Sequence, residues 1–280
     1  MIQCIDFDKH FEKYVTQWMG ENEGVFKNFD EMEAQIPFVY EQFLDTPATW
    51  LEGDKPGEYF ENFTDPDELI DLLVEYDAND ISTPDMLLNR IAQVALPCQK
   101  RLCEIVENES ASKSLRMTVI SLLRELDSVL PLPIYVKWVA TQNGESELCD
   151  GALESLQSMG EKAVQTLLAE VQQATEQGQI NILSIIAGRV QDTQLTKLAL
   201  HLLLTTQGQV AVLSDILGRL QDEKAIPTLE MLARSEETSY FDYIEIRNAI
   251  EMLGGEMPAR TYDVEDEEYA YMRLQQDDNR

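Results

Sequence analysis

The stretch that decides the fold is LGRLQDEKAIPTL, residues 217–229. It predicts the end of one helix, a tight polar turn and the start of a second helix that packs back on the first. We expect Leu217 and Leu220 to be buried between the two helices, with Ile226 and Leu229 facing them. The stretch therefore predicts a helical hairpin with an apolar interface.

The same signals recur upstream. GRVQD at 188–192 is repeated as GRLQD in the deciding stretch, and EKAVQTL at 161–167 is repeated as EKAIPTL at 223–229. We expect the glycine of the first motif to let a helix end close to its neighbour. Asp192 and Asp222 are expected to cap the helices that follow. Repeats spaced by about thirty residues are typical of a stacked helical solenoid, a fold that usually binds other molecules.

Apolar periodicity and turn signals predict five helix pairs between residue 84 and residue 234, and a last helix at 241–253 that ends at Gly254-Gly255. Successive pairs start at a spacing that suits two three-turn helices with short connections. The predicted pairs are 84–95 with 98–108, 114–126 with 131–141, 146–158 with 161–173, 178–190 with 193–205, and 208–220 with 223–234.

The first 80 residues look helical but do not repeat. They hold a stripe of Phe7, Phe11, Tyr14 and Trp18 on one predicted helix, a pattern that favours a core-facing surface over a ligand groove. A second helix is predicted at 30–44, either bent or started late by its proline.

Two further features of this region follow the second helix. The segment 46–60 is broken by proline and glycine yet carries three large aromatic residues, so we expect it to pack over the end of the helical array rather than bind a ligand. Asp65 and Pro66 are then expected to cap and open another helix.

Charge and aromatic content divide the chain into three regions. It has 280 residues, with 52 acidic and 21 basic side chains and a net charge of −31. We predict an acidic, aromatic-rich helical cap at 1–80, a repeat solenoid at 81–256 and an acidic tail at 257–280. The tail is expected to be mobile, or alternatively to dock its tyrosines on the last repeat as a short helix.

The acidic balance limits the classes of partner. It disfavours phosphate backbones and anionic membrane surfaces, so we expect neither nucleic acid nor membrane as a partner. It is explained either by solubility or by attraction of a basic partner. The N-terminus lacks the features of a signal peptide and no apolar run is long enough to span a membrane, so a cytoplasmic location is expected.

Residues that could carry chemistry are few. The four cysteines show no CxxC spacing and there are only two histidines, so a zinc site or a disulfide framework is not expected. His201 has no nucleophile or carboxylate at a fixed spacing. No phosphate-binding loop or nucleophile elbow occurs. The sequence therefore predicts no catalytic, cofactor or metal site.

The stretch at 217–229, with further matches at 156–167 and 186–198, resembles the HEAT-like repeat of the type named after phycobilisome lyases. The resemblance covers about 84–253 and implies an α-α superhelix, while the fold serves many functions. Known functional branches do not match. Di-iron hydroxylases use His-Glu pairs, whereas here His10 is followed by phenylalanine. Iron–sulfur reductases need clustered cysteines, and alkylation-repair glycosylases present a basic face.

We therefore expect an all-α protein whose function is that of a non-catalytic protein-interaction scaffold or adaptor. One alternative is an enzyme or lyase subunit that positions a cofactor or substrate in the concave groove, which a pocket lined by Trp18, Trp50 and Tyr59 would favour. Another is an acidic decoy that binds a basic protein. If the second helix of each pair lines the concave surface, the residues that meet a partner are Lys162, Gln165, Thr166, Lys197, His201, Lys224 and Thr228.

Overall fold

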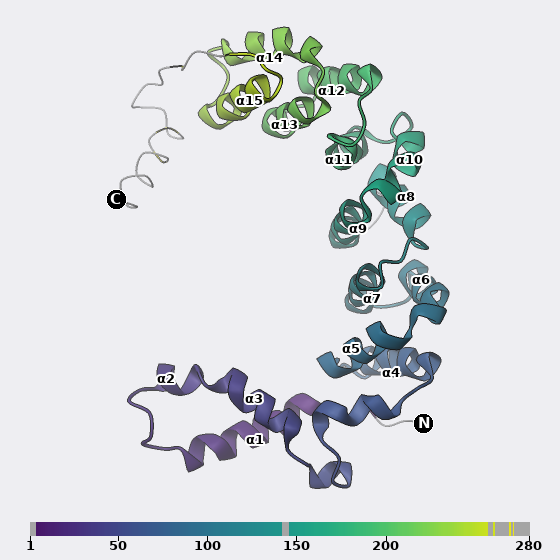
Figure 1. Ribbon diagram of the computed structural model, residues 1–280, viewed down its shortest axis with the longest axis vertical. Coiled ribbons are helices and arrows are strands. Elements are labelled where there is room, and N and C mark those ends of the chain that lie inside the picture. The colour runs from purple at the N-terminus through teal and green to yellow at the C-terminus, as the bar shows by residue number, and fades with distance from the viewer. Residues whose placement is uncertain (1–3, 142–145, 257–259, 261–268, 270, 272–280) are drawn as a thin grey trace. The chain divides into compact units, whose positions relative to one another are not determined.

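The computed structural model describes residues 4–141, 146–256, 260, 269 and 271 (Figure 1). Within these ranges the chain forms fifteen α-helices and four short 3₁₀-helices, and no strand. The prediction of an all-α protein is confirmed. None of the described helices combines the length and the apolar character that crossing a membrane requires.

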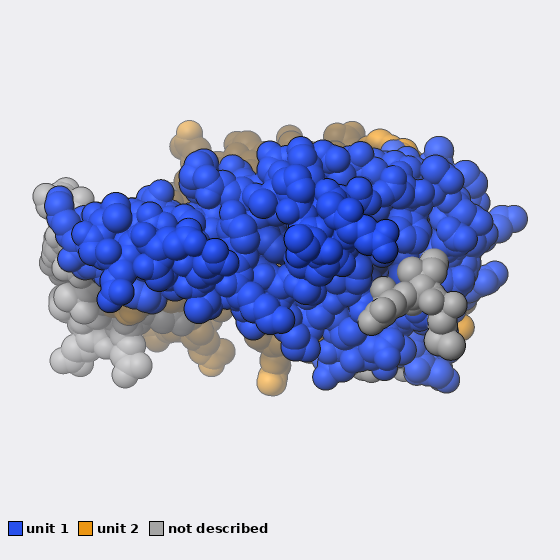
Figure 2. Space-filling view, turned by 90° about the horizontal axis from the view of Figure 1, so that it is seen from below, with its two compact units in different colours: residues 1–131 blue, residues 132–280 orange. Residues whose placement is uncertain are grey.

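The helices fall into two compact units, residues 1–131 and residues 132–280, coloured blue and orange in Figure 2. The predicted boundary after residue 80 lies inside the first unit, and the division into cap and solenoid stays a prediction.

The first unit carries seven α-helices, and its helices pack mainly on near neighbours in the chain. α1 packs on α3, η2 contacts both α3 and α5, α6 packs on α7, and α4 and α5 both contact α7. The helices are α1 (Phe7–Glu21), α2 (Phe29–Glu33), α3 (Ile36–Asp45), η1 (Thr49–Leu51), η2 (Pro56–Asn62), α4 (Pro66–Ala78), α5 (Asp85–Val94), η3 (Leu96–Cys98), α6 (Gln99–Glu107) and α7 (Lys113–Glu125).

Proline positions explain two helix starts in this unit. The helix predicted at 30–44 is divided into α2 and α3, because Pro37 lies in the first turn of α3, where its missing N–H costs no hydrogen bond. Asp65 caps α4 as expected, since its carboxylate accepts the N–H of Asp67 at 2.9 Å, and Pro66 begins the helix.

The second unit consists of eight α-helices in two rows. α8, α10, α12 and α14 form one row, and α9, α11, α13 and α15 form the other, which lies on the inner side of the curve of this unit in Figure 1. The helices are α8 (Leu132–Thr141), α9 (Ser146–Met159), α10 (Glu161–Glu170), α11 (Glu176–Ile186), α12 (Thr193–Thr205), α13 (Val210–Leu220), η4 (Glu223–Ala225), α14 (Ile226–Ala233) and α15 (Tyr240–Met252).

The deciding stretch forms the expected apolar junction. Leu217, Leu220 and Leu229 are buried, while Ile226 is only half-buried. The side chains of Asp192 and Asp222 accept backbone N–H groups at the starts of α12 and η4, at 2.8 and 3.2 Å. The predicted caps are therefore confirmed.

The repeated GRxQD motif does not adopt the same backbone in its two copies. α11 ends at Ile186 and Gly188 takes a left-handed φ of +85°, so the helix predicted to reach residue 190 is shorter. Gly218 instead stays inside α13, and the left-handed residue is Gln221. Gly218 also packs closely on α15, since a Cβ at this position would lie 3.1 Å from Cα of Ala249.

The arginines of the two motifs serve one purpose. Arg189 donates to the carbonyl oxygen of Ile185, and Arg219 reaches from α13 to the carbonyl oxygen of Ser184 at 3.1 Å. Both therefore satisfy carbonyl groups that the end of α11 leaves without helical partners. The hydrogen bond from Arg219 also joins α13 to α11.

Two predictions concern the C-terminal end of the second unit: the glycine stop of the last helix and the acidic tail. α15 ends at Met252 and Gly254 has a φ of +81°, so the predicted glycine stop is confirmed. Most of the predicted tail at 257–280 lies outside the described residues. Of the described part, the ring of Tyr269 lies 5.2 Å from that of Tyr240 at the start of α15.

Truncating Leu229 tests how the second unit is stabilised. We expect Leu229→Ala to cost about 2–5 kcal/mol, the usual loss for a large core residue. Hydrogen exchange should show loosening first at residues 208–253, with the first unit still protected, because repeats transmit stability mainly to their neighbours. Met231→Ala is the control, since Met231 is 57% exposed on the same helix. An even loss of protection along the chain would contradict this expectation.

Gly178 provides a second test. A Cβ at this position would overlap the carbonyl oxygen of Ala140, because the start of α11 packs directly on the end of α8. We expect Gly178→Ala to destabilise the protein by about 3 kcal/mol, the upper end of the usual cost of overpacking. Gly20→Ala has open space around it and should instead stabilise α1 by about 0.5 kcal/mol. Thermal unfolding of both variants measures the contrast, and equal effects would show that the close approach does not matter.

Candidate functional site

The first unit has a cleft of about 370 Å³ between α1 and the segment that follows α3. α1 lines it with four side chains at helical spacing, so they share one face of the helix. The segment 46–50 forms the opposite wall. The lining residues are His10, Lys13, Tyr14, Gln17, Phe43, Thr46, Pro47, Ala48, Thr49, Trp50 and Pro56.

The segment that forms the wall is closed on itself. The N–H of Ala48 donates to the carbonyl oxygen of Asp54 at 3.0 Å, and the N–H of Gly53 donates back to Ala48 at 2.9 Å. Lys55 then bridges the carboxylates of Asp45 and Glu58 at 3.1 and 3.2 Å. These bonds hold Trp50 in place beside α1.

A cluster of aromatic rings fixes α1 beneath the cleft. The buried ring of Phe7 lies 5.7 Å from the rings of Trp50, Tyr59 and Phe60. Such contacts stabilise beyond the area they bury. The segment 46–60 therefore packs on helices of the first unit and also leaves a hollow. Its predicted place over the end of the helical array stays a prediction.

The start of the chain is attached to α4 by one side chain. The hydroxyl of Tyr76 donates to the carbonyl oxygen of Ile5 at 2.8 Å and accepts its N–H at 3.2 Å. Burial is the main cause that raises the pKa of Tyr76, so the hydroxyl keeps its proton and both bonds persist at ordinary pH.

His10 and Trp50 form the central contact of the cleft. Their rings are stacked, with centroids 3.7 Å apart and planes inclined by 14°. Burial lowers the pKa of His10, the nearby charge of Lys13 lowers it further, and Asp6 opposes both. The ring is thus held in its neutral form, which suits stacking on an indole.

The charge of the cleft differs from that of the chain. Lys13 is the one lining side chain that carries a charge at neutral pH, since His10 is held in its neutral form. None of the lining residues is acidic. The first 80 residues carry a strong excess of acidic side chains, so this is a local exception. The cleft is suited to a neutral, flat or apolar group.

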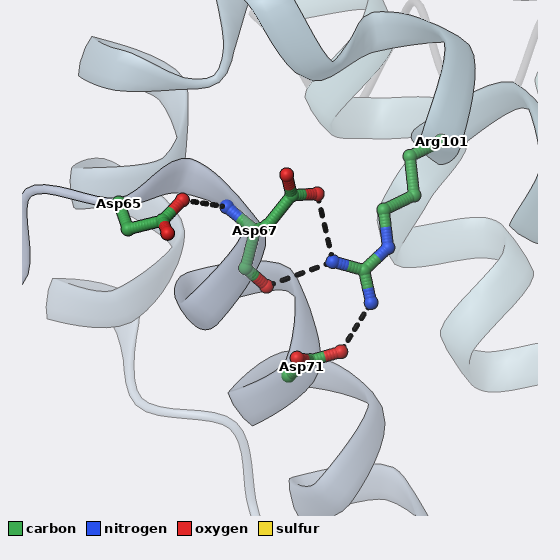
Figure 3. Close-up of polar contacts among 4 residues, drawn as sticks. All are labelled: Asp65, Asp67, Asp71 and Arg101. Carbon is green, nitrogen blue, oxygen red and sulfur yellow. Dashed lines mark hydrogen bonds and ion pairs between the residues drawn. The ribbon is translucent and has the colours of Figure 1, made fainter.

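A second group of charged side chains is structural. Arg101 on α6 reaches the first turns of α4, where it donates to the side chain and the carbonyl oxygen of Asp67, each at 2.9 Å, and to Asp71 (Figure 3). Asp65 is engaged in capping the same helix. The carboxylates of Asp67 and Asp71 join α4 to α6, and that of Asp65 caps α4. We therefore regard this cluster as structural rather than as a binding site.

Metal binding has no support in the described residues. Within them, no three histidine, cysteine, aspartate or glutamate side chains are grouped as metal ligands would be. The four cysteines are free thiols.

The predicted partner surface lies in the second unit, on α10, α12, η4 and α14. Its side chains are exposed, except that Thr166 and Thr228 are half-buried. These helices belong to the outer row in Figure 1, so a partner that bound there would meet the convex side of this unit. The exposed members are Lys162, Gln165, Lys197, His201 and Lys224.

The pocket expected to favour a ligand-positioning role is only partly formed. Trp50 lines the cleft, whereas Trp18 contacts Phe26 at 5.8 Å and Tyr59 packs against Phe63 at 5.6 Å. The three rings therefore do not share one cavity.

The cleft residues of α1 were missed in the sequence because a stronger pattern overlaps them. In the stripe of Phe7, Phe11, Tyr14 and Trp18, the two middle residues face α3, with ring contacts to Phe43 at 5.4 and 5.5 Å. A second set with the same helical spacing, His10, Lys13, Tyr14 and Gln17, was available as a signal. The opposite wall of the cleft is the segment 46–50, and no local signal in the sequence predicts where that segment lies.

Comparison with models of known protein families finds none that matches the chain, and no curated protein matches it in sequence. The resemblance to HEAT-like repeats therefore stays a prediction.

The titration of His10 tests the environment of the cleft. We expect its pKa, followed by NMR of the imidazole, to lie below the ordinary 6.5. Lys13→Gln removes a positive neighbour and should raise this pKa, whereas Asp6→Asn removes a negative one and should lower it further. Because the unfolded chain binds the proton more readily, stability should fall as the pH falls through the ordinary pKa of histidine. A pKa that neither variant moves would contradict this account.

Proposed function

We propose that this chain is a HEAT-like helical-repeat protein that acts as a non-catalytic scaffold for a partner protein with a basic surface, in the cytoplasm. The observation that carries the proposal is the packing of the second unit. Its main contacts join helices no more than three places apart in the chain. Stacking of this kind leaves long polar faces available for binding.

The charge of the chain supports a basic partner. A net charge of −31 over 280 residues attracts basic proteins at long range and accelerates their association, while phosphate backbones are repelled. The exposed polar side chains of α10 and α12, which include Gln165 and His201, are the proposed contact surface. Within it Glu161 and Glu170 would attract a basic partner, whereas Lys197 would oppose it.

The cleft beside His10 and Trp50 favours a second candidate, in which the protein positions a small ligand. A hollow of about 370 Å³ lies within the size range of small-molecule sites. This candidate is distinguished from the first by whether a small molecule remains bound when the protein is isolated from its own cells, as native mass spectrometry can measure.

The proposal is tested by affinity capture on the full-length protein from the source cell, followed by purification of the strongest partner. We expect a partner with a basic surface, whose affinity falls at least about tenfold between about 0.05 M and about 0.5 M salt. A bound cofactor with no protein partner, or an affinity independent of salt, would contradict the proposal.

A matched pair of variants locates the contact. Gln165→Arg adds a positive charge and bulk to the proposed surface on α10 and should weaken the partner's binding. Gln177→Arg makes the same change at an exposed site on α11, in the opposite row, and should leave the affinity unchanged. Equal effects of the two variants would show that the partner does not bind at this surface of α10.

A further inference from the structure

A second hollow adjoins the cleft along α3. This hollow has a volume of about 400 Å³. Tyr14 and Thr46 line both hollows, and we call the two adjoining hollows together the α1–α3 groove. The lining residues of the second hollow are Tyr14, Phe38, Glu41, Gln42, Asp45 and Thr46.

The two helices present matching faces to this groove. α1 contributes positions 10, 13, 14 and 17, and α3 contributes positions 38, 41, 42 and 45. Both sets have the spacing of one helical face. Figure 1 shows α1 and α3 side by side and running in opposite directions. The groove is therefore built by two helix faces rather than by a loop alone.

Apolar surface is exposed along the same hairpin. Phe38 is 57% exposed in the groove, and Phe29 and Val25 in the connection between α1 and α3 are 64% and 68% exposed. Grouped apolar side chains in water are costly and often mark contact surfaces. A binding partner would remove this cost.

Charge gives the groove two different ends. Lys13 lies at the cleft end, where the lining contains no acid. Glu41 and Asp45 lie along α3. Asp45 is paired with Lys55 at 3.1 Å, whereas Glu41 makes no ion pair within the described part of the chain. Glu41 is thus available for a cation from outside.

We propose that the α1–α3 groove binds a short segment of a partner protein that carries an aromatic side chain next to a lysine or arginine. The aromatic ring enters the cleft between Tyr14 and the His10–Trp50 stack, and the basic residue pairs with Glu41. This inference rests on the proposed scaffold function and adds the site and the chemistry of the bound segment.

The order of the two groups along the groove follows from charge. Trp50 alone would also attract a cation over its face, but Lys13 opposes a positive charge in the cleft. A neutral ring stacked against flat rings meets no such penalty. The cation is therefore directed to the α3 end, where Glu41 carries a negative charge with no ion pair among the described residues and the charge of Lys55 is shared between Asp45 and Glu58.

Short labelled peptides test the inference by fluorescence anisotropy on the full-length protein. The reference peptide has phenylalanine next to lysine. Replacing its phenylalanine by alanine should weaken binding about tenfold or more, as for an anchor residue. Replacing its lysine by glutamate should weaken binding by about threefold to tenfold, as for an exposed ion pair that becomes a repulsion. Equal binding of all three peptides would overturn the inference.

Charge reversal in the protein gives the matched control. Glu41→Lys should reverse the preference, so that the peptide with glutamate binds more tightly than the peptide with lysine. Glu109→Lys makes the same charge change at an exposed site between α6 and α7 that lines neither hollow and should keep the original preference. If both variants change binding alike, the effect comes from the net charge of the protein rather than from the groove, and the groove proposal is wrong.

Other occupants give other results. A second copy of this chain would appear as self-association that Phe38→Ser abolishes, and that result would overturn the proposal. If the captured partner binds with the expected salt dependence but is insensitive to Glu41→Lys, the groove proposal fails while the scaffold function stands. If no protein is captured and no peptide binds, both fail.

Discussion

The second unit depends on backbones that approach one another at points where no side chain fits. The start of α11 packs on the end of α8, where Thr175 donates its N–H to the carbonyl oxygen of Ala140 at 2.9 Å and Gly178 leaves room for the same oxygen. Gly218 plays the same part between α13 and α15. Because helices that are this close bury their leucine and isoleucine faces completely, these contacts allow short helices to be stable.

The sequence predicted well what is decided locally. Apolar periodicity located the helices, and Asp65, Asp192 and Asp222 marked their starts, because a cap needs only its own helix. Prediction failed where the local structure depends on a contact with a distant segment of the chain. The local motif does not distinguish Gly188, which follows the end of α11, from Gly218, which stays inside α13 and packs on Ala249 of a later helix. The cleft was missed for the same reason: His10 meets Trp50 only after the intervening hairpin has folded.

The protein thus has two surfaces of different character in its two units. The polar face of α10, α12 and α14 extends over successive helices of one row. The α1–α3 groove is irregular and combines flat rings, one lysine and a separate carboxylate. An extended face tends to give broad contact, whereas a groove with distinct ends favours one orientation of its ligand. The two surfaces are suited to affinity and selectivity respectively.

The attachment of Ile5 to Tyr76 has a consequence for the groove. The hairpin of α1 and α3 is held where it begins by these two hydrogen bonds and where it ends by η2, which packs on α3 and α5. Because the two helices run in opposite directions, both attachments lie at the open end of the hairpin and fix the two helices relative to each other there. The walls of the groove are preorganised, so that a visiting peptide gives up its own freedom but need not also immobilise its receptor.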